Sequence, residues 1–184
     1  LAGLSAKVTV ERDAAGVPTL TAATRADAAR ALGYVHAQER FFQMDLLRRA
    51  AGGELSALLG EATWPTDSTL RPHRLRARAR AVVAALPADQ RAVLDAYVVG
   101  VNAGLDALGA RPFEYLALRQ APEPWRPEDA ILAAFAMYLD LQFDGGYGLE
   151  LERDALAAAL PAPLAAFLMA DGDAWDAPLT GDAA

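Results

Sequence analysis

The sequence contains no cysteine, so disulfide bonds and thiol chemistry are excluded and the redox state of its compartment is left open. Lysine occurs once, at Lys7, and no basic and apolar leader of the signal-peptide type is visible. No apolar run reaches the roughly 18 to 20 residues that a membrane-spanning helix needs. The formal net charge of −7 argues against binding to a polyanion. We therefore expect neither a membrane nor a nucleic acid among the partners.

Groups that could carry catalysis are also scarce. Histidine occurs only at His36 and His73, and His36 lies in a strongly apolar segment, where we expect a hydrogen-bonded core residue. No serine stands in a nucleophile elbow, and no phosphate loop, dinucleotide fingerprint or zinc-ligand spacing occurs. Carboxylates gather in two places that are more typical of helix caps and solvated surface: Glu123 with Glu128 and Asp129, and Glu150 with Glu152 and Asp154. The residues alone therefore name no reaction.

What is present favours a mainly α fold. The 184 residues are one domain's worth, 54% hydrophobic and 22% charged. The stretch "GYVHAQERFFQMDLLRR" (33–49) is apolar nearly all round and still carries several charges, and 127–143 is similar. Helices buried on all sides belong inside a larger body than this chain builds, although a compact helical domain with a large core would have the same composition.

The N-terminus predicts a β-hairpin over residues 7–23. "KVTVER" alternates apolar and polar residues, "DAAG" offers a turn, and "VPTLTA" is a second extended run. A two-stranded sheet is marginal in water, and no third strand is predicted. We therefore expect this hairpin to join the sheet of a partner.

Residues 24–170 are expected to be helical. Thr24 and Asp27 resemble a capping box for a helix over 25–50, which Gly52 and Gly53 would end. "TWPTDSTLRP" (63–72) is expected to be a loop, "DGGYG" (144–148) a break, and 171–184 an irregular tail. The remaining helices are expected at 54–60, 73–86, 88–108, 113–118, 127–143 and 149–160.

One segment is rich in arginine, "RPHRLRARAR" (71–80). On a helix these arginines spread over more than one face. We favour a solvated or acid-paired helix surface over a phosphate-binding patch.

Four segments resemble one known family, in the same order and at similar spacing. They are "VERDAAGVPTLTA" (10–22), "ALGYVHAQERFFQMDLLRRAAGGELSALLG" (31–60), "YVVGVNAGLDAL" (97–108) and "PEPWRPED" (122–129). Over about residues 7–160 the chain resembles the small alpha subunit of the penicillin acylase family of N-terminal nucleophile hydrolases. The run at 33–49 is the most specific part of the match.

The resemblance implies an αββα heterodimer in which residues 1–184 are the single alpha-subunit domain. Members of the family are made as one exported precursor that cuts itself into this subunit and a larger beta subunit. The nucleophile is the serine at the N-terminus of beta, and its own amine acts as base through a water. We therefore expect no catalytic residue on this chain, a periplasmic or secreted location, a signal peptide already removed, and a tail near the processing site.

Two sites follow from the resemblance. In the family an alpha-chain glutamate, equivalent here to Glu150, helps to bind a structural Ca²⁺ together with beta-chain ligands; no cofactor is expected for catalysis. The end of the preceding helix supplies the alpha-chain side of the acyl pocket, which assigns substrate binding to Met137, Leu141, Phe143 and Tyr147. The charges of the helix at 33–49 are expected to be paired, because an unpaired buried charge would cost several kcal/mol.

The resemblance thus implies an amidase subunit. With its beta partner it would hydrolyse the amide bond of small N-acylated compounds, such as N-acyl homoserine lactones or β-lactams. Two other classes remain open from the residues: a non-enzymatic helical module that binds a partner protein, and a helical ligand-sensing regulator that uses the arginine-rich segment.

Overall fold

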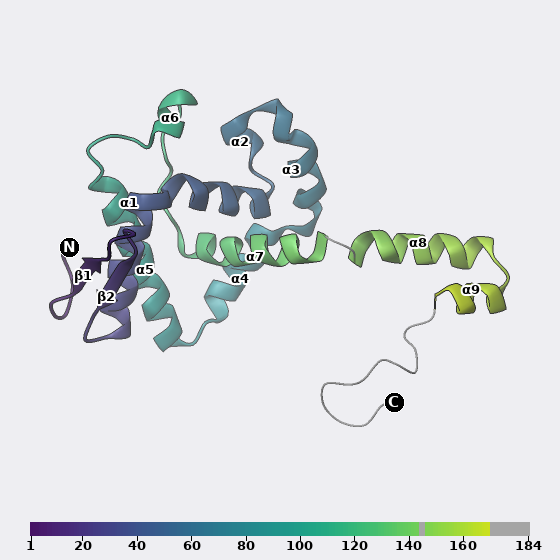
Figure 1. Cartoon of the computed structure of the whole chain (residues 1–184), viewed down its shortest axis with the longest axis horizontal. Coiled ribbons are helices and arrows are strands. Elements are labelled where there is room, and N and C mark those ends of the chain that lie inside the picture. The colour runs from purple at the N-terminus through teal and green to yellow at the C-terminus, as the bar shows by residue number, and fades with distance from the viewer. Residues whose placement is uncertain (144–145, 170–184) are drawn as a thin grey trace, which may run out of the picture. The chain divides into compact units, whose positions relative to one another are not determined.

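The computed structural model describes residues 1–143 and 146–169, with the backbone alone for 142, 143, 146, 147 and 149. The described chain is mainly helical and begins with a β-hairpin, as the sequence predicts and Figure 1 shows. It divides into two units, residues 1–139 and 140–184. The expectation of one alpha-subunit domain over residues 1–184 stays a prediction. Within the described residues, none of the helices combines the length and the apolar character needed to cross a membrane.

The predicted hairpin is confirmed. Strands β1 (Thr9–Arg12) and β2 (Pro18–Thr21) pair antiparallel. The Asp13 side chain closes the turn by accepting two backbone hydrogen bonds at 2.9 Å, and Gly16 has a positive φ of 80°. The described residues hold no third strand in this sheet, so both outer edges lack a strand partner. Open edges of this kind are sites where another chain can add a strand.

The long helix α1 (Arg25–Gly52) begins and ends close to where the sequence predicts. Thr24 accepts a hydrogen bond at 3.1 Å from the N–H of Asp27, and Gly53 ends the helix with a φ of 65°. The capping box is not reciprocal, because the Asp27 carboxylate accepts hydrogen bonds from the N–H (2.9 Å) and the hydroxyl of Ser5. Asp27 therefore fastens the N-terminal segment to α1.

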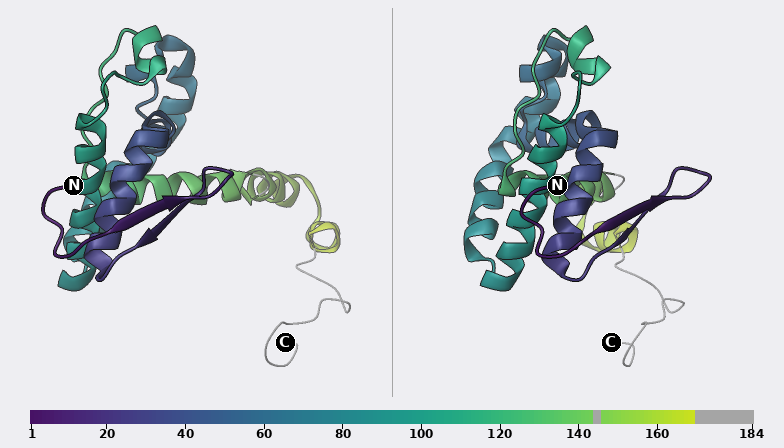
Figure 2. Two further views of the ribbon diagram at one scale, coloured as in Figure 1. Left: turned by 60° about the vertical axis from the view of Figure 1, so that its left-hand side comes forward. Right: turned by 90° about the vertical axis from the view of Figure 1, so that its left-hand side faces the viewer.

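Helix α5 (Ala88–Asp106) lies along α1, and Figure 2 shows the two side by side. Three glycines permit the close approach. A Cβ at Gly33 would lie 2.3 Å from a carbonyl oxygen of α5, and one at Gly100 or Gly104 would lie 2.0 or 2.4 Å from a carbonyl oxygen of α1. Any side chain at these positions would push the helices apart. α1 also has one non-helical residue, Arg40, where φ is −148°.

Two of the predictions for residues 1–139 are wrong. The expected loop at 63–72 contains a helix, α3 (Trp64–Leu70), because Pro65 occupies its first turn, where a missing N–H is tolerated. The helix expected from residue 73 begins two residues later, after Arg74 with a positive φ of 52°. The other elements of this part are α2 (Ser56–Leu59), η1 (Glu61–Thr63), η2 (Arg71–His73), α4 (Leu75–Ala85), α6 (Phe113–Ala117) and α7 (Pro127–Phe143).

The core of the first unit has two clusters. The larger gathers around α1 and includes Phe41, Met44, Val101, Tyr115 and Trp125. The smaller joins Ala51 of α1 and Ala79 of α4 to Leu132 of α7. Phe41 and Met44 are buried, and Phe42 packs partly buried against the same cluster. The helix that is apolar all round is therefore a central element.

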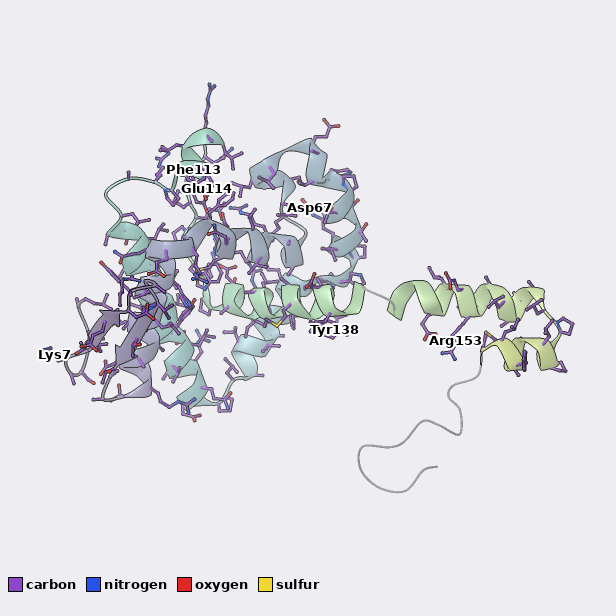
Figure 3. All side chains as sticks on the ribbon, viewed as in Figure 1. Lys7, Asp67, Phe113, Glu114, Tyr138 and Arg153 are labelled. Carbon is purple, nitrogen blue, oxygen red and sulfur yellow. The ribbon has the colours of Figure 1, made fainter. Side chains whose placement is uncertain are left out.

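The second unit contains α8 (Gly146–Ala159) and α9 (Ala162–Leu168). Arg153, labelled in Figure 3, donates a hydrogen bond at 3.1 Å to the carbonyl oxygen of Met169. Helix α8 begins at Gly146, inside the expected break. Helix α9 lies within the range 24–170 that is expected to be helical, although the sequence does not mark it as a separate helix. The expected tail at 171–184 lies outside the described residues.

Candidate functional site

The residues predicted to line the acyl pocket lie on α7 and just beyond it. Met137 and Leu141 are one helical turn apart, so they share a face of α7, and they are 66% and 72% exposed. The side chains of Phe143 and Tyr147 lie outside the described residues. Large apolar groups exposed on one helix face are typical of an interaction surface or of a ligand-binding groove.

A cavity of about 560 Å³ lies between α4 and α7. Its apolar walls come from Leu75 and Phe135, with the ring of Tyr138, which is 60% exposed and labelled in Figure 3. His73 and Arg78 supply the polar part of the lining, and the Arg78 Nε donates to the carbonyl oxygen of His73 at 2.9 Å. Such a cavity suits an apolar group with a polar end. Met137 and Leu141, the two predicted pocket residues whose side chains the structure describes, are not in this lining.

Beside these surfaces, a network of buried charges joins the helices. Asp45 is fully buried and accepts hydrogen bonds from Arg48 Nε (2.7 Å), Arg49 Nε (2.9 Å) and the Tyr115 hydroxyl (2.6 Å). The prediction that the charges of this helix are paired is therefore confirmed for its buried charges Asp45, Arg48 and Arg49. A buried carboxylate that accepts three hydrogen bonds is well satisfied. The loss of one partner would leave an unpaired charge in the low-dielectric core, which would destabilise the fold.

Asp129 is the second centre of this network and stands in the first turn of α7. Its carboxylate accepts from Arg48 Nη1 (2.7 Å), Arg76 Nη1 (2.8 Å) and the N–H of Arg126 (2.8 Å). Arg76 also binds both oxygens of Glu54, at 2.5 and 2.6 Å. Because these residues come from α1, the segment after it, α4 and α7, the network fixes the relative positions of three helices. We name the following residues the buried ion network: Asp45, Arg48, Arg49, Glu54, Arg76, Tyr115 and Asp129.

A cavity of about 350 Å³ opens beside the network. Its charged lining is Arg48, Arg49, Glu54, Arg76, Arg80, Glu123, Arg126 and Asp129. Asp45 pairs with two of these arginines and Glu128 pairs with Arg80. With these two included, the number of carboxylates equals the number of guanidinium groups. The cavity is therefore close to neutral. The acid-paired interpretation of the arginine-rich segment is confirmed for Arg76 and Arg80.

The network changes the proton affinities of its members. Burial raises the pKa of the Tyr115 hydroxyl far above its usual range, and the hydrogen bond to Asp45 raises it further. Burial works to lower the pKa of Arg48, but the charges of Asp45 and Asp129 outweigh it, so its pKa is raised. Arg76 behaves in the same way: hydrogen bonds to its carboxylate partners raise its pKa despite burial. These groups keep their charge states across the physiological range.

His36 is a half-buried residue whose Nδ1 lies 3.0 Å from the hydroxyl oxygen of Tyr97. This contact confirms the expectation of a hydrogen-bonded core histidine. Burial lowers the pKa of His36, and the charge of Arg40 lowers it further, against the opposing effect of Glu39. Burial also raises the pKa of Tyr97 to about 12. Both side chains are therefore neutral near pH 7, as a pair that joins α1 to α5.

Glu150, assigned to calcium by the resemblance, lies on α8 with an exposed side chain. Its carboxylate is the kind of ligand that Ca²⁺ prefers. Within the described residues, no three acidic, histidine or cysteine side chains come together in a way that could hold a metal ion. Glu150 therefore offers one carboxylate of the kind that a calcium site uses.

One structurally important residue, Asp67, is not recognised from the sequence. Asp67 is fully buried and accepts hydrogen bonds at 2.8 Å from the N–H groups of Leu55 and Ser56, and another from the Ser56 hydroxyl (Figure 3 labels Asp67). Burial opposes its ionisation, yet these hydrogen bonds lower the pKa of Asp67 overall. In the sequence, Asp67 opens "DSTL" inside an expected loop. An aspartate in that setting predicts a helix cap, not a buried carboxylate.

Comparison with known proteins identifies the family. The family model for penicillin amidase matches residues 7–176. The chain therefore belongs to the penicillin amidase family, as the sequence motifs indicated.

Individual relatives agree with this assignment. The chain is 45% identical to Penicillin acylase 2 proenzyme of Pseudomonas sp. (strain SE83) over 129 residues, covering 70% of this chain and 17% of that relative. It is 36% identical to acyl-homoserine lactone acylase QuiP of Pseudomonas aeruginosa over 159 residues, covering 85% and 18%. The chain spans about a sixth to a fifth of the length of the curated relatives that it matches.

A solved structure gives the same answer for the fold. The chain superposes on a chain of thermostable penicillin G acylase from Alcaligenes faecalis with a TM-score of 0.77 and 29% sequence identity. The match covers 97% of this chain and 98% of that chain. The helices and the N-terminal hairpin therefore form a fold that is shared within the family.

Proposed function

We propose that this chain is the small subunit of a two-chain amidase that hydrolyses the amide bond of small N-acylated compounds. Its relatives are named for two substrate classes, penicillins and acyl-homoserine lactones. In the proposed enzyme the serine nucleophile begins a separate, larger subunit, so this chain contributes helices and part of the acyl pocket.

The observation that carries the proposal is a difference in coverage. The chain matches 98% of one solved penicillin G acylase chain, yet 17% of a relative whose name describes it as a proenzyme. If a precursor is cleaved, one of its product chains is a whole chain in the mature enzyme and only a small fraction of the uncleaved proenzyme. The two coverages agree with that relation. We accordingly propose that the larger subunit comes from the same precursor.

The surface of the chain supports a large partner. Among the described residues no strand pairs with either outer edge of the hairpin, and large apolar side chains are exposed on several elements, including Phe113 at 76% and Leu116 at 58% on α6. Exposed apolar groups and open strand edges favour association with another protein surface. The proposed larger subunit would cover both.

For the acyl pocket we propose the face of α7 that carries Met137 and Leu141, together with Phe143 and Tyr147. The exposure of Met137 and Leu141 supports this assignment, since a buried core position could not meet a substrate. We also propose that Glu150 gives one ligand to a structural Ca²⁺ completed by the partner, and that the mature enzyme is periplasmic or secreted.

The test is to express the full precursor and analyse the purified protein. We expect two chains, the larger of which begins with serine, threonine or cysteine by N-terminal sequencing, and hydrolysis of N-acyl homoserine lactones or penicillins. Replacing that first residue of the larger chain by alanine should abolish hydrolysis. A monodisperse 184-residue monomer without hydrolytic activity would reject the amidase and favour a helical interaction module.

A further inference from the structure

Helix α7 is held at its first turn by charge and along its length by apolar packing. Asp129 is 1% exposed and is bound by Arg48 from α1 and by Arg76 from α4. One turn further on, Leu132 is fully buried against Ala79 of α4. Leu75 of α4 and Ile131, Phe135, Ala136 and Leu139 of α7 pack around this contact. The ion pairs at the first turn therefore act together with apolar packing to set the position of α7.

The same helix carries an exposed face further along. Met137 stands eight residues after Asp129, which places it about 12 Å along the helix axis from the ion pair. Tyr138 and Phe135 belong to the cavity that α7 shares with Leu75 and Arg78 of α4. A small rotation of α7 at its first turn would therefore move both this face and one wall of the cavity.

Arg76 is the member of the network that links α4 to α7 directly. Its Nη1 lies 2.8 Å from Asp129, while its Nε and Nη2 hold Glu54 in a two-pronged contact. Its side chain is 20% exposed and that of Glu54 is 29% exposed, so both groups reach solvent. Without Arg76, Asp129 would keep Arg48 and the N–H of Arg126. Removal of Arg76 therefore leaves no buried carboxylate without a partner, and the chain should still fold.

We propose that Arg76 is a positioning residue that sets the acyl-group preference of the enzyme. Through Asp129 it fixes α7 on α4, and thus the place where the Met137 face and the Tyr138 wall meet an acyl group. This inference rests on the amidase function proposed above. It assigns a role in specificity to an ion pair that does not touch the substrate.

The experiment uses the full two-chain protein and a series of N-acyl homoserine lactones of increasing acyl length. In Arg76→Gln we expect the ratio of kcat/KM between long and short acyl groups to change by roughly tenfold, because one misplaced apolar contact is worth about that much. The change should be carried mainly by KM, since the reacting groups lie on the other subunit. Arg76→Lys keeps a charge near Asp129 and should restore part of the wild-type ratio.

Arg91→Gln is the matched control, because Arg91 makes an exposed ion pair with Asp95 on α5 and belongs neither to the buried ion network nor to the lining of the cavity between α4 and α7. It should leave the ratio unchanged. If Arg76 were merely structural, the variant would lose active protein, so kcat would fall equally for every acyl length with KM unchanged, and this result would overturn the inference. An unchanged ratio in an active Arg76→Gln enzyme would also overturn it. A wild-type enzyme that hydrolyses none of the compounds would instead reject the proposed function itself.

Discussion

Replacing Asp45 by asparagine should destabilise the protein more than any exposed charge change. The Asp45 carboxylate is fully buried and bound by two guanidinium groups and one hydroxyl. Asparagine has nearly the same shape, so the change removes charge and one acceptor without leaving a cavity. Arg48 would still have Asp129, but Arg49, whose side chain is 9% exposed, would keep only a contact of 3.5 Å to the largely exposed Glu123.

The expected loss follows from that geometry. Breaking a buried ion pair by removing one partner costs about 3 to 5 kcal/mol of unfolding free energy, because the remaining charge stays buried. Tyr115→Phe removes one hydrogen bond to the same carboxylate and leaves both arginines, so its cost should be smaller, about 1.5 to 3 kcal/mol. Asp95→Asn disrupts an exposed helical pair with Arg91 and should cost about 0.5 kcal/mol or less.

The assay is chemical denaturation of the full protein with each of the three substitutions. We expect the order of stability loss to be Asp45→Asn, then Tyr115→Phe, then Asp95→Asn. If Asp45→Asn proves too unstable to purify while Asp95→Asn is obtained normally, the order still holds. A loss for Asp45→Asn within about 0.5 kcal/mol of the exposed control would show that the buried charges are not coupled as described.

Three further predictions concern packing, pH and metal. Gly100→Ala should cost about 1 to 3 kcal/mol, because its Cβ would meet the backbone of α1 at 2.0 Å, whereas Gly109→Ala, with no atom within 4 Å, should be nearly neutral by thermal melting. The pKa of His36 is lower in the folded protein than in the unfolded chain, so on acidification the unfolded chain takes up the proton at a higher pH than the folded protein does. The free energy of unfolding should therefore fall as the pH drops below about 6.5, the usual pKa of histidine. His36→Gln, which can still hydrogen-bond Tyr97, should lose this pH dependence in denaturation curves; an unchanged dependence would contradict the assignment. Glu150→Ala should lower the melting temperature of the two-chain protein with little change in kcat, and chelation should lower that of wild type but not of the variant; chelation without effect on wild type would reject the calcium site.

Local patterns in the sequence were sufficient for most of the helices and for the hairpin. Thr24 and Gly53 mark the ends of α1 because capping depends on groups a few residues apart, and Pro127 marks the start of α7 for the same reason. The errors are local too. Pro65 predicts a loop, although a proline is also compatible with a first helical turn.

The family could also be determined from the sequence, since its motifs are contiguous, and with it the expectation that this chain leaves the nucleophile to a partner. The charges of α1 could be expected to be paired, because the cost of an unpaired buried charge does not depend on where its partner lies. Which partners they have could not be predicted.

The tertiary structure alone decided those partners. Asp129 lies 81 residues after Arg48 in the chain, and no periodicity connects them. Likewise, Gly100 and Gly104 lower the helix propensity of their segment in the sequence. Only the structure shows that the backbone of α1 packs directly against them. Local propensity acts over one or two turns, whereas ion pairs and helix contacts depend on the path of the whole chain. The sequence therefore determined the elements and the family, and the fold determined how α7 is held and what its exposed face can meet.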